Sequence, residues 1–401
     1  MNNFIKKAFI IIIVIVCFYG CFTHFISLCQ QNLIVKPNYL SLAEDLQKES
    51  YKNLDYFDFS SLDKILEELE TNTIFGKDNF KDKVRDLIDG NYSLNFKDVF
   101  SYMLSIFFSG IKKIVPMLAT IIAVAVLSNI VGQFKGKKNL GEIVHFVCFC
   151  AVIVIVCASV TNMIKLAQNS IFSMQKQMEI VFPVILTLMA SVGNTVSVGI
   201  YQPILAMLSG IIINVFSYVV LPIFIISFVV SIVGNLSNNV KLNKLSSFLN
   251  DIFKWVIGIV FTLFTGIMSI KGISAGSYDS VSIRTTKFAL KTYIPIVGGY
   301  LSDGFNLIMA SSILIKNAVG PAGLLLIFIS IISPIISILI FKWGIHLTSA
   351  FLEPLMDNKI SNFLFSVSKA LNMLISSILC VALMYLISIG LLMTTGNVYW
   401  G

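Results

Sequence analysis

The chain has 401 residues, of which 56% are hydrophobic and only 12% are charged, and its mean hydropathy is +0.87. Soluble domains carry about 25% charged residues, so the composition excludes an ordinary soluble protein and predicts an integral membrane protein. The formal net charge of +8 does not indicate nucleic-acid binding, because the bases of the apolar part lie in short segments between apolar runs, where they orient membrane spans.

The charges divide the chain into three regions. Lys6 and Lys7 precede an apolar run over residues 8–28, which predicts a signal peptide or signal anchor over 1–29 and leaves its cleavage open. Residues 30–113 contain 14 acidic and 11 basic residues, whereas residues 114–401 contain 7 and 16. We therefore predict an extracytoplasmic polar helical region over 30–113 and a multi-span membrane domain over 114–401.

The polar region shows helical periodicity. Apolar residues recur at intervals of three and four in three stripes, as expected for short amphipathic helices near the membrane surface. The stripes are Leu62, Ile65, Leu66 and Leu69; Phe80, Val84, Leu87 and Ile88 before Gly90; and Phe96, Val99, Phe100, Met103, Leu104 and Phe107. Two interpretations stay open: a small cap that packs on itself and a surface that binds a partner.

The membrane domain contains apolar runs long enough to cross a bilayer, which takes about 20 residues. We predict an all-α polytopic protein with about seven spans, near 114–134, 143–164, 180–200, 204–234, 252–270, 322–345 and 370–393. The fourth run is too long for one straight span and contains Pro222, so it is tilted, kinked or a pair of half-helices.

Basic residues give an orientation. With residues 30–113 outside, the first span brings Lys135, Lys137 and Lys138 inside, as the positive-inside rule prefers. Counting seven spans also places the basic segment 271–291 inside.

A basic segment is followed by an interrupted apolar one. Arg284, Lys287 and Lys291 share one face of a helix, which predicts a cytoplasmic surface that contacts lipid headgroups or partners. The next residues read as a re-entrant or broken segment beside a cavity, because irregular backbone at membrane depth needs protein or water around it. The candidate pathway or broken-helix residues are Pro295, Gly298, Gly299, Asp303, Gly304 and Lys316. A surface helix followed by a short buried helix is the alternative.

Catalytic motifs are not indicated. Residues 272–276 spell G-x-S-x-G, but that motif requires a strand, turn and helix that a membrane-helix end does not supply. The seven cysteines all fall in apolar segments, which predicts packing roles rather than disulfides or a metal site. We expect no enzyme activity, no catalytic or metal-binding residue and no cofactor.

Several short motifs of the membrane domain carry a family resemblance. They are Phe182-Pro183, Tyr201-Gln202-Pro203, Leu221-Pro222, Arg284-Thr285-Thr286-Lys287, residues 294–299, Leu301-Ser302-Asp303, residues 316–320 and residues 353–357. Together they resemble the stage III sporulation protein AE family of endospore-forming bacteria, densely over residues 180–393.

The resemblance implies a membrane component of a channel-like complex between the mother cell and the engulfed forespore. In that family the protein lies in the mother-cell-derived membrane around the forespore, with its N-terminal region in the intermembrane space. It works beside ring-forming intermembrane proteins and a cytoplasmic ATPase, and a homo-oligomer stays open. Three functions stay open as well: a permease-like or pore subunit, a non-conducting scaffold, and a stand-alone secondary transporter.

Overall fold

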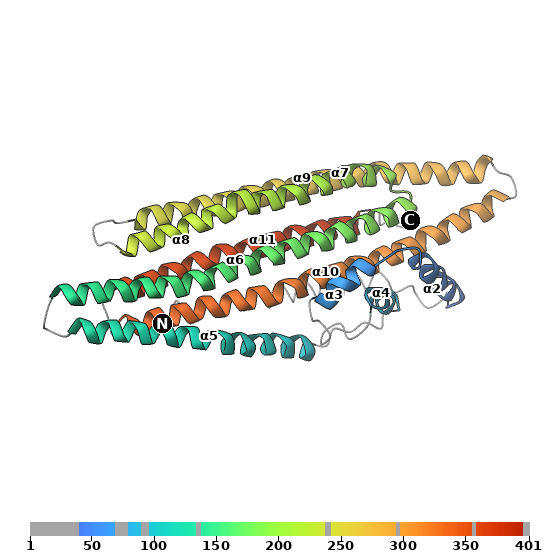
Figure 1. Ribbon diagram of the computed structural model, residues 1–401. Helices are drawn as coiled ribbons and strands as arrows, with labels where there is room; N and C mark the ends of the chain where they lie inside the picture. Colours follow the sequence, from blue (N-terminus) through green and yellow to red (C-terminus); the bar gives the residue numbers. More distant parts are fainter. Residues whose placement is uncertain are drawn as a thin grey trace.

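The protein is a long helical bundle with a small helical module against its side (Figure 1). The computed structural model describes residues 40–68, 79–89, 96–133, 138–236, 242–293, 297–354 and 358–395, and every regular element in these ranges is helical. The signal sequence predicted over 1–29 lies outside them. The predicted all-α membrane fold is confirmed, since these ranges contain six helical stretches long and apolar enough to cross a membrane.

The helices fall into two sets. The side module consists of α2 (Leu40–Leu54), α3 (Ser60–Glu68) and α4 (Phe80–Ile88). The bundle consists of α5 (Phe96–Gln133), α6 (Lys138–Ser191), α7 (Thr195–Val215), the π-helical turn η2 (Phe216–Val220), α8 (Leu221–Leu236), α9 (Asn243–Tyr293), α10 (Val297–Leu352) and α11 (Asn358–Thr394). With 54 and 56 residues, α6 and α10 are each about 80 Å long, more than twice the thickness of a bilayer's hydrocarbon core.

The prediction of a separate span at 180–200 is wrong. Helix α6 contains the span predicted at 143–164 and continues without a break to Ser191. The chain then reverses at Gly193, whose φ of 92° lies in the left-handed region that glycine adopts without strain. The N–H of Gly193 donates to Ala190 O and that of Asn194 to Met189 O, which is the Schellman ending of a helix. The described residues therefore contain six candidate spans rather than seven.

The long run predicted at 204–234 is one continuous helical path. Between α7 and α8 the helix widens into η2, where the N–H of Leu221 donates to Phe216 O. Pro222 has no N–H for the carbonyl of Tyr218, so a wider turn accommodates it without breaking the helix. Of the three shapes that the sequence allowed, the structure excludes a separated pair of half-helices.

Helix α10 forms the centre of the bundle. In its most apolar stretch 89% of the residues are buried, against 17% for α5 and for α9. It is a continuous helix from Val297 onward, so the break predicted among Gly298, Gly299 and Gly304 is absent. The side module supports this region from outside, since Asn53 on α2 donates a 3.0 Å hydrogen bond to Ser311 Oγ on α10. The glycines are therefore tolerated inside a helix that tertiary contacts stabilise.

Glycines set the closest helix contacts. A Cβ on Gly110 of α5 would lie 2.6 Å from Ile340 Cδ1 of α10, and one on Gly320 of α10 would lie 2.3 Å from Met393 Sδ of α11. Small residues let membrane helices approach each other in this way, without a hydrophobic driving force between them.

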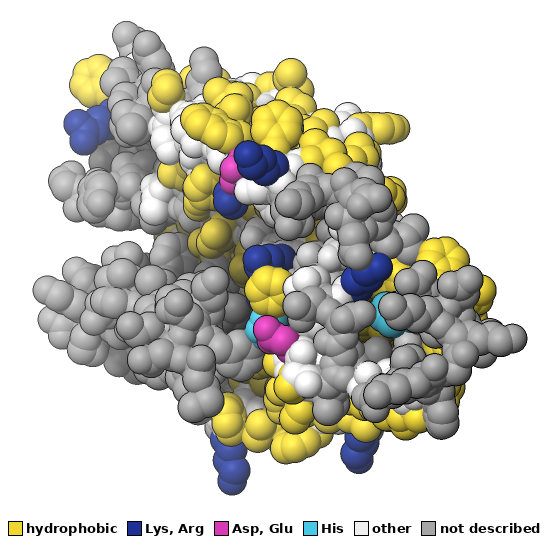
Figure 2. Space-filling model, turned by 90° about the vertical axis from the view of Figure 1, so that its left-hand side faces the viewer, with side chains coloured by type: hydrophobic (Ala, Val, Ile, Leu, Met, Phe, Trp, Pro, Cys, Tyr) yellow, Lys and Arg dark blue, Asp and Glu magenta, His cyan; other side chains and the backbone are white. Residues whose placement is uncertain are grey.

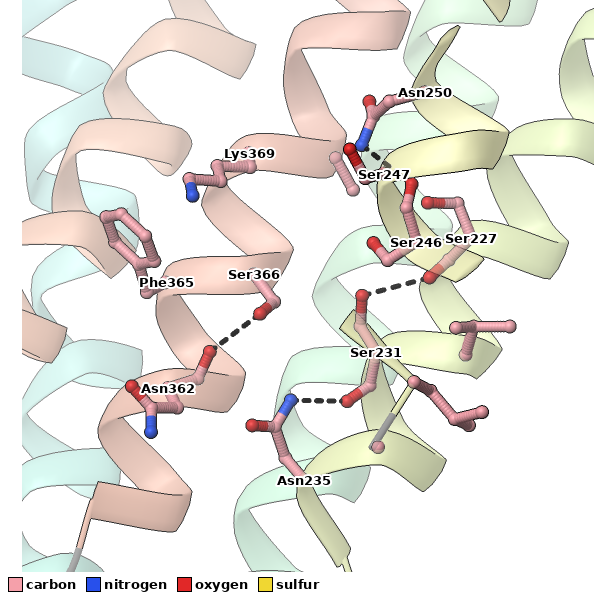
Figure 3. A pocket seen from close by; sticks show the side chains of 14 residues that line it. Ser227, Ser231, Asn235, Ser246, Ser247, Asn250, Asn362, Phe365, Ser366 and Lys369 are labelled. Carbon is pink, nitrogen blue, oxygen red and sulfur yellow. Dashed lines mark hydrogen bonds between the residues drawn. The ribbon is translucent and has the colours of Figure 1, made fainter. Parts of the chain in front are cut away.

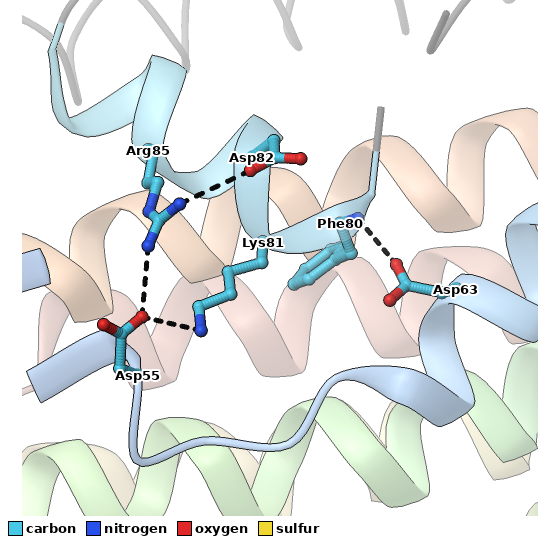
Figure 4. Close-up of polar contacts among 6 residues, drawn as sticks. All are labelled: Asp55, Asp63, Phe80, Lys81, Asp82 and Arg85. Atoms are coloured by element: carbon cyan, nitrogen blue, oxygen red, sulfur yellow. Dashed lines mark hydrogen bonds and ion pairs between the residues drawn. The ribbon is translucent and has the colours of Figure 1, made fainter. Parts of the chain in front are cut away.

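Helices α2–α4 share the core of the bundle. The stripe predicted for α4 is confirmed, because Phe80, Val84, Leu87 and Ile88 are all buried. In the stripe predicted for α3, Leu62 and Leu66 are buried, and Ile65 and Leu69 lie outside the described side chains. Asp55 at the end of α2 holds α4 through Lys81 Nζ at 2.6 Å and Arg85 Nη2 at 3.1 Å, and Asp63 accepts the backbone N–H of Phe80 at 2.7 Å (Figure 4). The module is a cap that packs on itself and on the bundle.

The two ends of the bundle carry different connections. The α9–α10 turn and the side module lie toward one end, and the α5–α6, α8–α9 and α10–α11 connections lie at the other (Figure 1). The side module and the α9 segment 271–291 thus lie toward the same end of the bundle, whereas the sequence placed them on opposite sides of the membrane; the sides themselves stay a prediction. Over residues 143–234 the sequence predicted three spans. The chain crosses the bundle only twice there, through α6 and through α7–α8.

Candidate functional site: a polar groove between three membrane helices

A groove of about 920 Å³ runs between α5, α6 and α10. Each helix contributes polar side chains at intervals of three or four residues, so that each presents one polar stripe. The polar side chains that line it are Tyr102, Ser105, Ser109 and Lys113 of α5, Asn169, Ser170, Ser173 and Lys176 of α6, and Ser330, Ser333 and Ser337 of α10. We call this feature the α5–α6–α10 groove.

The groove lies between apolar helices. Its α10 residues, 329–337, fall in the middle of the candidate span Asn306–Leu352. At its floor Pro334 has no N–H, so the carbonyl of Ser330 loses its donor within the helix. Polar side chains within apolar helices are costly against lipid and are found where they face other protein or water.

The inner wall contains polar atoms without protein partners. The Nε2 of Gln177, a fully buried residue, donates to Ser330 Oγ, whose own hydroxyl donates to Leu326 O at 2.8 Å. The Oε1 of Gln177 and the Oγ of Ser170 are buried and have no hydrogen-bond partner within the part of the chain that the structure describes. Buried polar groups are normally satisfied, so these two atoms, which the protein encloses, are exceptions behind the wall of the groove.

Two ammonium groups give the groove its charge. Lys113 lies on the α5 wall and Lys176 on the α6 wall, and no carboxylate is among the described residues that line it. The nearest acidic residue along α6 is Glu179, whose carboxylate accepts a 2.8 Å hydrogen bond from Gln175 and is not part of the lining. The groove is therefore polar and cationic.

A second, smaller cavity of about 430 Å³ lies between α8, α9 and α11 (Figure 3). Its polar side chains mostly bond to their own helices: Ser231 Oγ donates to Ser227 O, Asn235 Nδ2 to Ser231 O, and Ser366 Oγ to Asn362 O. Lys369 is the charged residue among the described lining. Because these hydroxyls already donate to backbone carbonyls, this cavity offers a ligand fewer free donors than its composition suggests. In the α5–α6–α10 groove Ser105, Ser109 and Ser330 also donate to carbonyls of their own helices.

The end of the bundle opposite the side module is shown in Figure 2. Lysine and arginine side chains outnumber acidic ones among the described groups visible there, and hydrophobic side chains cover much of the periphery. An apolar surface of this kind is typical of a protein that lipid surrounds.

The candidate residue Lys316 takes a structural position. It is fully buried, and its Nζ donates to Met393 O at 3.0 Å and to Thr395 O at 2.9 Å, at the end of α11. These carbonyls belong to the last turn of a helix, which has no backbone donors of its own. Lys316 is not part of the groove lining, so its predicted pathway role stays a prediction.

The other predicted residues lie elsewhere. Gly298, Gly299, Asp303 and Gly304 belong to the first turns of α10, while Pro295 lies outside the described residues. Arg284 is exposed on α9, and Lys287 and Lys291 lie on the same helix at the end beside the α9–α10 turn. Their predicted contacts with lipid or partners stay predictions.

Asp279 has a clear role that the sequence did not indicate. The side chain is 1% exposed on α9, and its two carboxylate oxygens accept the N–H groups of Val196 and Ser197, each at 3.0 Å. These N–H groups belong to the first turn of α7. A negative charge at this end of a helix is also stabilised by the helix dipole. The G-x-S-x-G pattern just before it lies inside the continuous helix α9, without the strand that the nucleophile motif requires.

The fold and the groove define an α-helical polytopic membrane protein with a cationic polar groove between its apolar helices. A family model described as stage III sporulation protein AE matches residues 78–396, so the chain belongs to the stage III sporulation protein AE family. A relative named "Stage III sporulation protein AE" from Bacillus subtilis (strain 168) is 25% identical over 324 residues, which is 79% of this chain and 80% of the relative. No solved structure matches the chain. It is a sporulation membrane protein, and its family is not one of known enzymes.

Proposed function

We propose that the protein is a subunit of a channel-like complex between mother cell and forespore, required for late forespore development, and that the α5–α6–α10 groove lines part of its path. The single observation that carries the proposal is the convergence of three polar stripes in the middle of a membrane bundle. Maintaining nine hydroxyl or amide groups and two lysines between apolar helices is costly unless water or solute uses them.

The proposed location is the mother-cell-derived membrane around the forespore. At the end opposite the side module, α6, α9 and α11 begin with Lys138, Lys244 and Lys359 in their first turns, and the positive-inside rule assigns such an end to the cytoplasm. Helices α2–α4 then lie on the extracytoplasmic side, which here is the intermembrane space. This arrangement supports contact of α2–α4 with ring-forming intermembrane proteins and of the lysine-rich end with a cytoplasmic ATPase.

A non-conducting scaffold is the second candidate, and the side module favours it. Helices α2–α4 are fixed to α10 and present charged side chains, among them Lys52 and Asp58, to solvent. A rigid charged surface of this kind suits a docking partner. A stand-alone secondary transporter is the third candidate, and transport by the purified protein without partners would favour it.

The groove variants Ser109→Leu and Ser333→Leu test the first candidate, with Ser376→Leu at an exposed position of α11 as the matched control. Leucine fills the groove with apolar volume and is a good helix former, so insertion should be unaffected. We expect few mature spores from the groove variants and normal numbers from the control, at equal protein levels and with equal co-purification of partners. Normal sporulation by both groove variants would show that the path does not use the groove and would favour the scaffold.

A further inference from the structure

We infer that the α5–α6–α10 groove selects anionic solutes. This inference rests on the proposed function, because it names the class of solute that the same groove would pass. It follows from the signs of the charges that line the groove, from their spacing, and from the hydrogen-bond donors between them.

The fixed charge of the groove has one sign. Lys113 and Lys176 are contributed by opposite walls, and the described lining contains no carboxylate. Low-dielectric walls concentrate such a field and raise the local concentration of ions of opposite charge. An anion entering the groove meets two ammonium groups, whereas a cation meets repulsion from both.

The two lysines are separated along the groove. Ile114, next to Lys113, lies against Gly344, and Gln177, next to Lys176, bonds to Ser330, so the two lysines lie at levels of α10 that differ by roughly twelve residues. At 1.5 Å per residue this is about 18 Å along the bundle axis. A small anion can therefore move from one ammonium group to the other along the serines of the groove floor.

Hydroxyl and amide groups can replace the hydration shell of an anion. Ser333 and Ser337 lie on the floor, and Asn169 and Ser173 lie on the α6 wall. A serine hydroxyl rotates to donate to whatever faces it, and an amide contributes two N–H donors. The volume of about 920 Å³ is at the upper end of the range of small-molecule sites, so the groove is large enough for organic anions as well as inorganic ones.

The test measures how fast a groove cysteine reacts with reagents of opposite charge. Ser333→Cys is introduced into the full chain after its seven native cysteines are replaced and sporulation is verified. Membranes are treated with a sulfonate-bearing or a trimethylammonium-bearing methanethiosulfonate, and each rate is divided by that of a free thiol. We expect a preference of at least about ten-fold for the anionic reagent, the lower end of the range that focused fields produce.

Substitutions of the lysines identify the cause. The double variant Lys113→Gln with Lys176→Gln should bring the rate ratio close to one. The double variant Lys112→Gln with Lys165→Gln removes the same charge from exposed positions outside the groove and should leave the ratio unchanged. Two outcomes would overturn the inference: equal rates for both reagents, or a rate ratio that the first double variant does not lower. In either case the reaction itself would still show that water reaches the groove. A residue 333 cysteine that neither reagent modifies would instead overturn the proposed path itself.

Discussion

The ammonium nitrogen of Lys316 lies 2.9 Å from the carbonyl oxygen of Thr395, so a buried lysine of α10 fixes the last turn of α11. Thr395 is held a second time, because its Oγ1 lies 3.2 Å from the hydroxyl oxygen of Tyr201 on α7. Three helices therefore meet at one polar point within an otherwise apolar core. A buried polar group in this position stabilises only while its hydrogen bonds are intact.

We predict that Lys316→Met destabilises the bundle by about 1–3 kcal/mol, because methionine keeps the shape of the side chain but leaves two buried carbonyls without a donor. Thermal unfolding of the purified protein and the rate of protease cleavage near residue 395 measure the effect. Lys165→Met, at an exposed position of α6, is the control and should change neither quantity. A stable Lys316→Met variant that nevertheless fails in sporulation would assign Lys316 to the pathway instead.

A second prediction concerns the cap that α9 provides for α7. Asp279→Ala removes both acceptors of the Val196 and Ser197 N–H groups, and we expect a loss of about 1–3 kcal/mol in unfolding free energy. Asp251→Ala is the matched control, because that carboxylate is 59% exposed and pairs with Lys254 on its own helix. Equal melting temperatures for the two variants would contradict a capping role.

The local patterns of the chain predicted its short helices well. The stripes of α3 and α4 could be read directly, because a period of 3.6 residues is a property of one segment, and Leu62 and Val84 are indeed buried. The length of α6 could not be predicted from the sequence. Lys165, Lys176 and Glu179 interrupt its apolar run, and hydropathy alone does not distinguish a loop from a helix that exposes its charged side chains.

The groove was also missed by the sequence interpretation, for a physical reason. The spacing of Ser105, Ser109 and Lys113 on α5, and of Ser330, Ser333 and Ser337 on α10, is visible in the sequence as a polar stripe within an apolar helix. Each stripe alone also suits serines that donate to their own backbone. Only the packing of three helices, distant in sequence, shows that the stripes face one another.

A third prediction concerns the contact between α10 and α11. A Cβ at residue 320 would lie 2.3 Å from Met393 Sδ and 2.7 Å from its Cγ. Gly320→Val must therefore displace the buried side chain of Met393, whose carbonyl accepts a hydrogen bond from Lys316. We expect a loss of about 1–3 kcal/mol, as is usual for overpacking. Gly258→Val on α9 is the control, because a Cβ there has no contact within 4 Å. A Gly320→Val variant as stable as the control would mean that Met393 repacks at little cost.

The last prediction concerns pH and the side module. Lys81 and Arg85 lower the pKa of Asp55 below its ordinary value, the hydrogen bond to Lys81 being the largest cause. A carboxyl group whose pKa is lower in the folded state contributes stability above its unfolded pKa of about 3.9 and loses that contribution as the pH falls through the folded value. Acidification below about pH 4 should therefore loosen α4 from α2.

The nearby phenol of Tyr51 does not titrate in this window. Burial and its hydrogen bond to Asp89 raise its pKa to about 12, so it remains a neutral donor throughout the acid range. Protease cleavage within residues 40–89 of the intact protein, followed from pH 7 to pH 3, measures the loosening. Asp55→Asn should show the low-pH cleavage rate already at pH 7 and should change less on acidification than the wild-type protein. A pH profile that is the same in both proteins would show that other carboxyl groups control the attachment of α4.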